Sequence, residues 1–470
     1  MINMMKSIYS NVKACIKNSS DMSYSNFFEI SLGVKQGEPL SPLLFILFIN
    51  GVTEIIEYNN LTQNDLDILS VFMLLFADDI ALFTTDPGSL QNQLNSLYQY
   101  SCKWGLKINS SKTKICIFEK RKSICNFRWT INNEILEVVD NFCYLGINFS
   151  SNGKFNHAVK MLNDQALKAY NHLLSIFSKV SLDIKTKLSL FDALVVPILL
   201  YGAEVWGIYT FTDLDKLHIK FCKHVLGVKQ QTSNAAVFGE LGRFPLTTVC
   251  KEKSIKYWLK IINSPNSLMH ETLMKQIQFA HDNRINDLNS LWFSSLSTLL
   301  NKLGFGNLID FTMSEYLLPM FSQRLKDQYI QSWHETLSVQ PKMEYYCKFK
   351  EDFEFEHYLV NIKNEKHRKE LTRFRLSSHS LEIETGRYNN IERSNRICKL
   401  CTQNVVESEY HFLLCCTAYS DLRKDYNISS NWPNITKFKY IMSEKKESKV
   451  RNTAKYIYNA MKLRKNKLES

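Results

Sequence analysis

One stretch, residues 71–83, reads VFMLLFADDIALF and constrains this chain more than any other. Two apolar, strand-like runs flank Ala77, Asp78 and Asp79, which predicts a β-hairpin with neighbouring carboxylates at its turn. Asp is a favoured turn residue, so such carboxylates can simply form the turn. Two adjacent negative charges repel each other unless a cation lies there, however, and Mg²⁺ binds carboxylate oxygens together with phosphates. The stretch therefore favours a hairpin that holds a divalent metal ion.

The composition describes a large globular protein with an anionic partner. With 470 residues and 45% hydrophobic content, the chain can form two or three domains. The net charge of +12 fits nucleic acid or an anionic membrane surface. Residues 103–128 contain eight Lys or Arg against one acid, and residues 437–470 eleven against three. The positive charge is therefore concentrated in two segments.

Cysteine usage and segment hydropathy predict where the chain resides. The twelve cysteines show no spacing typical of a disulfide framework, which indicates a reducing compartment. No secretory segment is visible, and the most apolar run, residues 43–49, is too short to span a bilayer. We expect an intracellular protein, nuclear or cytoplasmic, that is not secreted and has no membrane partner. The run at 43–49 is interpreted as a buried helix.

The segment GVKQGEPLSP, residues 33–42, predicts a tight loop that leads into this apolar helix. Its two glycines permit unusual backbone angles and close approach of another molecule. Ser41 as N-cap and Pro42 at the first helical position would begin the helix. A loop of this composition can also be a simple connection.

Apolar periodicity predicts an α+β fold in the first part of the chain and helices in the rest. Helices are expected over residues 1–17 and 87–104, and short strands at 27–32, 115–118, 128–131 and 143–149. These elements would form a short antiparallel sheet with helices on one face. After residue 155 the pattern predicts long helices, including 184–201 and 214–226.

Metal-binding residue types gather near the C-terminus. Cys398 and Cys401 have the spacing of a zinc knuckle, and His411 follows ten residues later, before the adjacent Cys415 and Cys416. Three cysteines and a histidine complete a closed tetrahedral Zn²⁺ site, which is structural rather than catalytic. Spacing alone leaves open which of the last two cysteines takes part, and ordinary buried thiols are the alternative.

Basic residues lie on both sides of this cluster. Residues 366–375 carry five basic residues, and His379 after them is expected to be hydrogen-bonded rather than a metal ligand. Residues 449–465 predict a basic amphipathic helix with apolar Val450, Ala454 and Ile457 on one side. Such a helix could dock on the protein and face nucleic-acid phosphates, or lie on an acidic membrane. The rest of the sequence favours nucleic acid.

Four blocks together resemble a known family. In order, spacing and residue type, the segments at 33–42, 76–79, 104–114 and 144–146 are similar to successive blocks of non-LTR (LINE-type) retrotransposon reverse transcriptases. The resemblance implies an RNA-directed DNA polymerase with two-metal nucleotidyl transfer. Its implied cofactor is Mg²⁺ or Mn²⁺, and its implied partners are an RNA template, a DNA primer and deoxynucleoside triphosphates. Within the C-terminal block, it favours Cys416 over Cys415 as the zinc ligand.

The resemblance also implies roles for single residues. Asp78 would bind the catalytic metals, with Asp79 as a secondary ligand. Lys112 would neutralise charge on the leaving pyrophosphate, although Lys107 and Lys114 lie close by in sequence. The remaining implied contacts are Gln36 and Gly37 for the nucleotide and template, and Tyr144, Leu145 and Gly146 for the primer.

The implied organisation is a partial palm, a mainly α-helical thumb and connector, and a small zinc-binding module. The expected segments are a palm at 1–150, a thumb at 151–230, a connector at 231–365, a basic segment with the Cys/His cluster at 366–425 and a basic tail at 426–470.

The polymerase reaction needs a third carboxylate that bridges both metal ions, and the family carries it upstream of the glycine-containing block. Asp21 is the only acid before Glu29, and it lies in a polar turn rather than a buried strand. We therefore expect a chain truncated at its N-terminus, with little polymerase activity alone. The alternative is a non-catalytic nucleic-acid-binding remnant of such an element.

Overall fold

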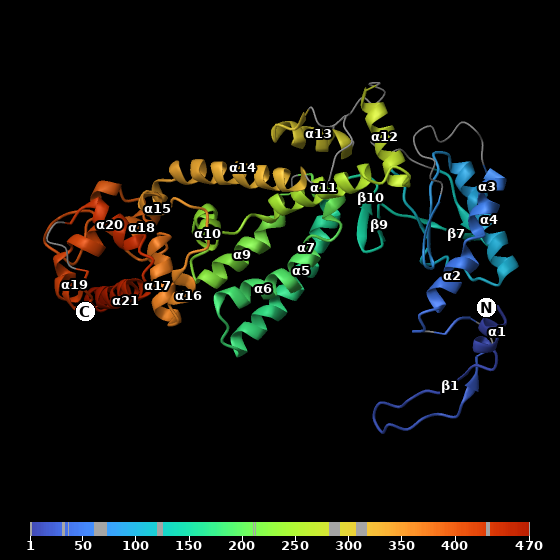
Figure 1. The fold of residues 1–470 in the computed structure, drawn as a ribbon, viewed down its shortest axis with the longest axis horizontal. Coiled ribbons are helices and arrows are strands. Elements are labelled where there is room, and N and C mark those ends of the chain that lie inside the picture. Colours follow the sequence, from blue (N-terminus) through green and yellow to red (C-terminus); the bar gives the residue numbers. More distant parts are fainter. Residues whose placement is uncertain are drawn as a thin grey trace. The chain divides into compact units, whose positions relative to one another are not determined.

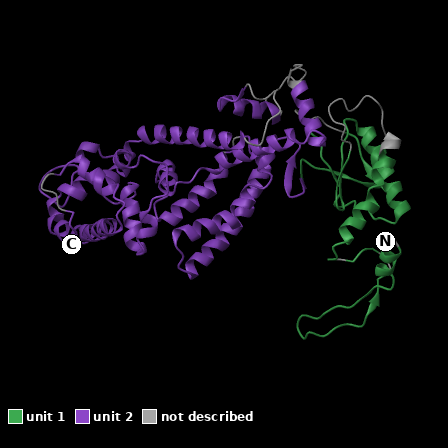
Figure 2. Ribbon diagram, viewed as in Figure 1, with its two compact units in different colours: residues 1–142 green, residues 143–470 purple. Residues whose placement is uncertain are grey.

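The computed structural model describes residues 2–30, 33–35, 37–60, 73–119, 126–209, 211, 213–281, 292–306, 317–428 and 433–469. These residues are mostly helical, and their strands form small two-stranded sheets (Figure 1). The chain divides into two compact parts, residues 1–142 and 143–470, which we call the N-terminal unit and the C-terminal unit (Figure 2). No helix within the described ranges is long and apolar enough to cross a bilayer.

The N-terminal unit begins with a short helix, α1 (Ile2–Tyr9), and not with the helix predicted over residues 1–17. The helix ends early because Asn11 adopts left-handed backbone angles, with φ +56°, and turns the chain into a strand. This strand, β1 (Lys13–Ala14), pairs antiparallel with β2 (Phe28–Glu29). β2 is a short part of the strand predicted at 27–32.

The apolar helix α2 (Ser41–Ile49) starts one residue earlier than predicted. Ser41 is the first helical residue rather than the N-cap, and its hydroxyl donates to the carbonyl of Lys35 at 2.5 Å. The hydroxyl therefore closes the preceding loop instead of capping the helix.

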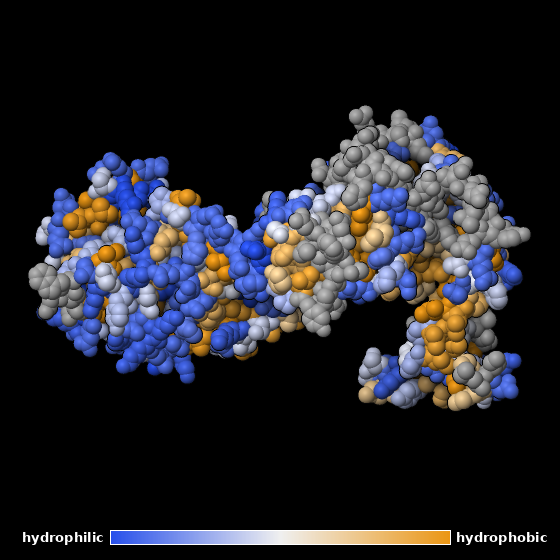
Figure 3. Space-filling view, turned by 45° about the horizontal axis from the view of Figure 1, so that its top comes forward, coloured by the Kyte–Doolittle hydropathy of each residue, from blue (hydrophilic) through white to orange (hydrophobic). Residues whose placement is uncertain are grey.

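The prediction that α2 is buried is wrong for most of its length. Leu43, Ile46 and Leu47 are 53%, 53% and 64% exposed, at positions that share one side of the helix. Hydrophobic residues also gather in areas of the molecular surface (orange in Figure 3). Apolar composition predicted burial, but no described element covers this side of α2.

The core of the N-terminal unit forms where α2, α3 (Val52–Asn60) and α4 (Pro87–Trp104) meet the hairpin of β3 and β4. The predicted helix 87–104 is confirmed at both ends. Asp86 caps it by accepting a hydrogen bond from the Ser89 amide at 2.7 Å, and Gly105 ends it at φ +68°.

The remaining strands of this unit do not form the single antiparallel sheet that we predicted. β5 (Lys114–Ile115) pairs parallel with β8 (Glu137–Val138), and β6 (Thr130–Ile131) pairs antiparallel with β7 (Glu134–Ile135). The strand predicted at 143–149 is instead a hairpin of β9 (Asn141–Tyr144) and β10 (Ile147–Ser150).

The C-terminal unit is helical. Its first helices are α5 (Asn156–Lys179), α6 (Ile184–Leu194), α7 (Val196–Leu199), α8 (Ala203–Trp206), α9 (Leu214–Leu226), α10 (Asn234–Leu241), α11 (Leu246–Ile262), α12 (Leu268–His281), α13 (Trp292–Lys302) and α14 (Leu318–Ser338). Its last are α15 (Tyr346–Phe349), α16 (Tyr358–Asn361), α17 (Glu365–Arg375), α18 (Glu382–Tyr388), α19 (Ser420–Asp425), α20 (Ile435–Met442) and α21 (Glu447–Glu469). One core runs from α5 to α21, so the segments predicted as thumb, connector and C-terminal module share buried contacts.

A buried ion pair ties α10 to α17. The carboxylate of Glu240 is fully buried and accepts a hydrogen bond from Arg375 Nε at 2.5 Å. The hydroxyls of Tyr358 and Tyr346 also donate to it, at 2.7 and 3.1 Å. Because every oxygen of this carboxylate has a donor, its burial is compensated.

The residues after Glu240 are fixed by close packing. Gly242 adopts φ +56°, and a Cβ there would lie 2.5 Å from the backbone nitrogen of Phe355, so only glycine fits. Arg243 next to it donates to both oxygens of Asp192, at 2.9 and 2.5 Å. Residues 240–243 therefore join α6 to the segment around Phe355 and to α17.

Candidate functional site

The predicted acidic hairpin is present in the structure. β3 (Met73–Phe76) and β4 (Asp79–Leu82) pair antiparallel, with Phe76 opposite Asp79. The turn has two residues, Ala77 and Asp78, and not the three that the sequence suggested, since Asp79 already belongs to β4. Residues 71 and 72 of the predicted hairpin lie outside the described residues.

The turn is tight and carries backbone strain. Ala77 has φ +52°, a left-handed conformation in which an L residue with a Cβ costs about 1–2 kcal/mol. Glycine would adopt this conformation freely, but an alanine at this position does not indicate a left-handed backbone angle. Strained backbone of this kind concentrates at functional sites, where surrounding structure maintains it.

The two faces of the hairpin differ in exposure. Met73, Leu75, Ile80 and Leu82 pack on the core with α2, α3 and α4. Phe76, 60% exposed, faces outward, and Asp78 and Asp79 are exposed at the tip. The core thus holds the hairpin in place while both carboxylates stay accessible to a ligand.

The fit of a divalent ion to this tip is incomplete. Within the described ranges, the group of three or more metal-binding side chains close enough to share an ion is the C-terminal cluster, and it includes neither Asp78 nor Asp79. Two neighbouring carboxylates could hold Mg²⁺ only with water or substrate phosphates in the other positions.

Asp21 lies in the polar turn that the sequence predicted. Its Oδ1 accepts hydrogen bonds from the Ser23 amide at 3.0 Å and from the Ser23 hydroxyl at 2.7 Å. These hydrogen bonds lower the pKa of the Asp21 carboxyl. Asp21 is thus exposed and hydrogen-bonded within its own turn.

The loop that precedes α2 is open at its glycine. Gly37 has φ +82°, and no atom lies within 4 Å of where its Cβ would be, so another molecule can approach the backbone there. Glu38 beside it accepts a hydrogen bond from the Tyr9 hydroxyl at 2.7 Å, which fixes the loop against α1. Gln36, the other residue expected to contact nucleotide or template, lies outside the described residues.

The three lysines considered for the pyrophosphate differ in their contacts. Lys114 forms an ion pair with Glu137 at 2.6 Å across β5 and β8. Lys112 and Lys107 are exposed, and no described carboxylate forms an ion pair with either of them. Lys114 is thus occupied, and Lys112 and Lys107 are available to an anionic ligand.

The residues expected to hold the primer form the turn of the β9–β10 hairpin. Tyr144 ends β9, and Leu145 and Gly146 make the turn with φ of +48° and +81°. The Tyr201 hydroxyl donates to the Leu145 carbonyl at 2.8 Å, and a Cβ on Gly146 would lie 3.1 Å from the Tyr201 ring. Tyr201 therefore braces this turn.

The contact between Tyr201 and this turn was not predicted from the sequence. The Tyr201 carbonyl accepts a hydrogen bond from Trp206 Nε1 at 2.9 Å, and Trp206 is buried. Gly202 between them lies where a Cβ would come within 2.9 Å of Ile147 in β10. The available signal was the aromatic-Gly spacing, but nothing local in sequence links it to residues 56 positions earlier.

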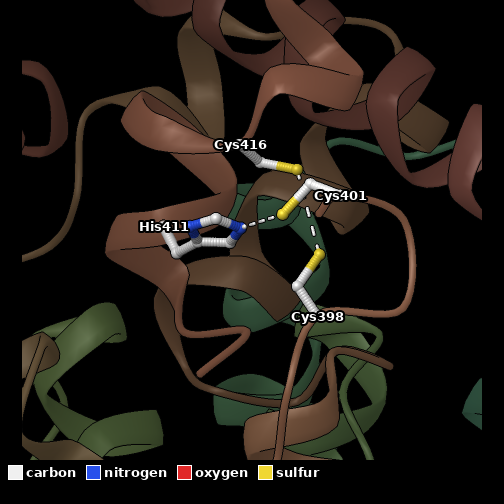
Figure 4. Close-up of side chains that lie close together, drawn as sticks. All are labelled: Cys398, Cys401, His411 and Cys416. Carbon is white, nitrogen blue, oxygen red and sulfur yellow. Dashed lines mark hydrogen bonds between the residues drawn. The ribbon is translucent and has the colours of Figure 1, made fainter. Parts of the chain in front are cut away.

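The C-terminal cluster brings together Cys398, Cys401, His411 and Cys416 (Figure 4). Their four ligand atoms all lie within 4.8 Å of one another, and Cys398 and Cys401 come from one turn. The Sγ atoms of Cys398 and Cys416 are 3.9 Å apart, and Cys401 Sγ is 3.4 Å from His411 Nε2. Around Zn²⁺ with bonds of about 2.0–2.3 Å, tetrahedral ligand atoms lie about 3.5–3.8 Å apart, so the residues fit this ion.

The adjacent cysteine is excluded by position. Cys416 is fully buried within the cluster, whereas Cys415 is half-buried outside it, near the Tyr410 hydroxyl. A hydrogen bond with Cys416 lowers the pKa of the Cys398 thiol and raises that of Cys416. Geometry therefore selects Cys416, which the family resemblance favoured and which spacing alone left open.

Sequence reasoning missed the carboxylates that fix the cluster to its surroundings. Glu407 lies 3.9 Å from Cys398 Sγ and accepts hydrogen bonds from Arg464 Nη2 at 2.6 Å and from the Glu382 amide at 2.7 Å. Because Arg464 belongs to α21 and Glu382 to α18, this carboxylate joins the cluster to both helices. Arg464 also neutralises the negative charge beside Cys398.

Glu409 anchors the other side of the cluster. Its carboxylate accepts hydrogen bonds from Ser377 at 2.7 Å and from His379 Nε2 at 3.0 Å, all three groups being buried. Burial would raise the pKa of Glu409, but these hydrogen bonds lower it below its ordinary value. His379 is hydrogen-bonded and lies outside the cluster, as expected.

Comparison with known proteins adds an independent observation. Residues 2–149 match the family described as reverse transcriptase (RNA-dependent DNA polymerase). The chain is 26% identical over 251 residues to the RNA-directed DNA polymerase from mobile element jockey of Drosophila funebris, which is 51% of this chain and 26% of that protein. It is 27% identical over 221 residues to the Pol polyprotein from the type-1 retrotransposable element R2 of Popillia japonica, 45% of this chain and 30% of that protein. It is 31% identical over 140 residues to the Pol polyprotein from the type-2 retrotransposable element R2DM of Drosophila melanogaster, which is 28% of this chain and 13% of that protein. The chain thus spans less than a third of the length of these relatives.

Proposed function

Because residues 2–149 belong to the reverse transcriptase family of non-LTR retrotransposons, we propose that this chain carries the polymerase site of an RNA-directed DNA polymerase of such an element. The observation that carries the proposal is the β3–β4 hairpin. Within the residues that match the family, it presents Asp78 and Asp79 at an accessible tip fixed by a strained turn. The substrates are an RNA template, a DNA primer and deoxynucleoside triphosphates.

Each residue of the site has a role in this proposal. A bound Mg²⁺ or Mn²⁺ supplies Lewis-acid polarisation of phosphate oxygens. Asp78 and Asp79 hold that ion, and Lys112 compensates negative charge on the departing pyrophosphate. Separately, in the C-terminal unit, the turn at Leu145 and Gly146, braced by Tyr201, is the proposed contact for the primer strand. Gly37 leaves room for the nucleotide and the template backbone.

We expect the isolated chain to incorporate nucleotides poorly. The two hairpin carboxylates have no third carboxylate beside them in the part of the chain that the structure describes. A two-metal site needs ligands that bridge both ions, so metal affinity should be low and the attacking and leaving oxygens poorly fixed.

Primer extension with the purified 470-residue chain tests the proposal. Asp78→Asn should abolish the Mg²⁺- or Mn²⁺-dependent signal. Asp86→Asn is the matched control, because it removes one charge from the same unit while Asn still caps α4. The affinity for Mn²⁺, measured from the decrease in the EPR signal of the free ion, should be lower in the Asp78 variant only. Incorporation that survives Asp78→Asn would refute the role of the hairpin. Robust synthesis by the unaltered chain would refute the expectation that its metal site lacks a necessary carboxylate.

A second function is favoured by the surface of α5. Lys160, Lys168 and Lys179 are exposed on this helix, and no described carboxylate forms an ion pair with them. A non-catalytic nucleic-acid-binding remnant would keep such contacts without polymerase chemistry. Salt-sensitive RNA binding that is unchanged by Asp78→Ala, together with no incorporation in any divalent metal, would favour this second function.

A further inference from the structure

Two helices of the C-terminal unit, α17 and α21, lie side by side (Figure 1). The apolar stripe predicted on α21 is buried in the core, with Val450, Ala454 and Ile457 at 7%, 0% and 0% exposure. This stripe is therefore not available for a membrane surface, and α21 turns its charged side toward solvent.

Four lysines line the solvent side of this helix pair. Lys363 and Lys366 lie just before and at the start of α17, and Lys455 and Lys462 lie two turns apart on α21. All four are exposed, and within the described ranges no carboxylate comes within the 4.0 Å that defines an ion pair. We call these four residues the lysine strip.

Most other basic residues of α17 are used within the fold. Arg375 is bound to Glu240, and Arg373 Nε donates to the Gly227 carbonyl at 2.8 Å, at the end of α9. Lys369 pairs with Glu365 at 2.7 Å, and Arg368 donates to a backbone carbonyl. The lysine strip is thus positive charge on this helix pair that no described carboxylate compensates.

An aromatic contact joins the two helices within the strip. The rings of His367 and Tyr458 lie 4.9 Å apart, with 55° between their planes, and both side chains are half-buried. Tyr458 follows Lys455 by three residues and precedes Lys462 by four, so the three share one side of α21. An aromatic face therefore lies between lysines.

The pKa values of nearby groups indicate an excess of positive potential. Burial and then the charge of Lys455 lower the pKa of His367. Burial together with Lys187 and Lys369 lowers the pKa of His224 on α9. Glu365, which pairs with Lys369, opposes this effect at His224. A polyanion would relieve the remaining repulsion.

We propose that the lysine strip and Tyr458 bind a single strand of nucleic acid, with the lysines on its phosphates and the tyrosine ring against a base. Lysines interleaved with an aromatic face are the usual arrangement for single-strand binding, because a duplex hides the faces of its bases. This inference rests on the proposed function in one respect, because the proposed function is the reason for choosing nucleic acid as the polyanion. It does not require the hairpin to be active.

Binding of a labelled single-stranded RNA of about 20 nucleotides to the full chain, by fluorescence anisotropy over a salt series, tests the strip. The triple variant Lys366→Gln, Lys455→Gln, Lys462→Gln should reduce the slope of log K against log salt by about 2 and weaken binding at ~0.1 M salt about 10- to 100-fold. The matched control, Lys216→Gln, Lys424→Gln, Lys439→Gln, removes three lysines of the same unit that pair with acids, and should change affinity less than about twofold. Equal slopes in the two triple variants would overturn the proposal.

Tyr458→Leu tests the aromatic contact, because Leu keeps apolar contact with His367 but removes the stacking face. Affinity for single-stranded RNA should fall about fivefold or more, with duplex affinity unchanged. An equal loss of affinity for duplex RNA would overturn the single-strand assignment. A chain that sediments with phosphatidylserine vesicles but does not bind RNA would overturn the choice of partner. Unchanged thermal unfolding of each variant shows that it folds. Nucleotide incorporation by Asp78→Asn reports on the hairpin separately, so failure of one site is distinguishable from failure of the other.

Discussion

Two neighbouring cysteines offer a sharp test of the C-terminal cluster. Cys416 belongs to the group of four ligand side chains, and Cys415, one residue earlier, does not. Cys416→Ser replaces a fully buried thiol with a hydroxyl, which is a poor Zn²⁺ ligand at this position. Cys415→Ser makes the same chemical change on a half-buried side chain outside the cluster. The pair therefore separates loss of a ligand from loss of a thiol.

The expected magnitude follows from linkage between metal binding and folding. Zinc at a free concentration about 1,000-fold above its dissociation constant stabilises the folded state by about 4 kcal/mol. Three cysteines and a histidine whose ligand atoms lie within 4.8 Å of one another form the ligand set of a structural Zn²⁺ site, for which an affinity this high is typical. We expect about one Zn²⁺ per chain in the unaltered protein and in Cys415→Ser, and less than about 0.2 in Cys416→Ser.

Atomic absorption of the purified chains measures the zinc, and urea unfolding with and without EDTA measures the stability. EDTA should destabilise the unaltered protein and Cys415→Ser by about 4 kcal/mol and leave Cys416→Ser almost unchanged. Full zinc content in Cys416→Ser, or its loss from Cys415→Ser, would refute the assignment. Unaltered protein without zinc, and insensitive to EDTA, would refute the site itself.

Three further predictions concern stability. Arg375→Met should lower the free energy of unfolding, measured in urea, by about 3–5 kcal/mol, because it leaves the buried Glu240 without its cation. Burial would raise the pKa of Glu356, but Arg375 and Lys350 lower it. The ionised Glu356 carboxylate therefore stabilises the folded state fully above the unfolded-state pKa of about 4.3. This contribution disappears as the pH falls through the lower folded-state pKa of Glu356. Unfolding of Glu356→Gln below about pH 4.3 should thus depend less steeply on pH than that of the unaltered chain. Ala77→Gly should raise stability by about 0.5–1 kcal/mol, since relief of the left-handed strain exceeds the added chain entropy, and a lower melting temperature would contradict this.

Elements with strong local signals were predictable. The helix at 87–104 has Asp86 before it and Gly105 after it, and both cap it in the structure. The helix at 214–226 likewise ends at Gly227 with φ +68°. The Cys/His cluster and the acidic hairpin also depend on residues close in sequence, which is why local patterns identified them.

Elements that depend on what covers them were not predictable. The run at 43–49 was predicted to be buried because it is apolar, yet Leu43, Ile46 and Leu47 are exposed. Apolar periodicity gives the side of a helix that avoids water, not the element that packs on it. The strands after residue 114 pair over two residues each, too short for alternation to show their partners or direction.

The buried ion pairs that support the Cys/His cluster and the helical core were missed for a related reason. Glu407 and Arg464, 57 residues apart, and Glu240 and Arg375, 135 apart, meet only in the folded chain. In sequence these residues are ordinary surface-type charges, and local reasoning assigns them to solvent. The number of basic residues also overstates the positive charge available to nucleic acid, because Arg375 and Arg464 form ion pairs with buried carboxylates. Only the structure separates these arginines from lysines without a carboxylate, and that distinction, rather than the total of +12, decides where a phosphate backbone can bind.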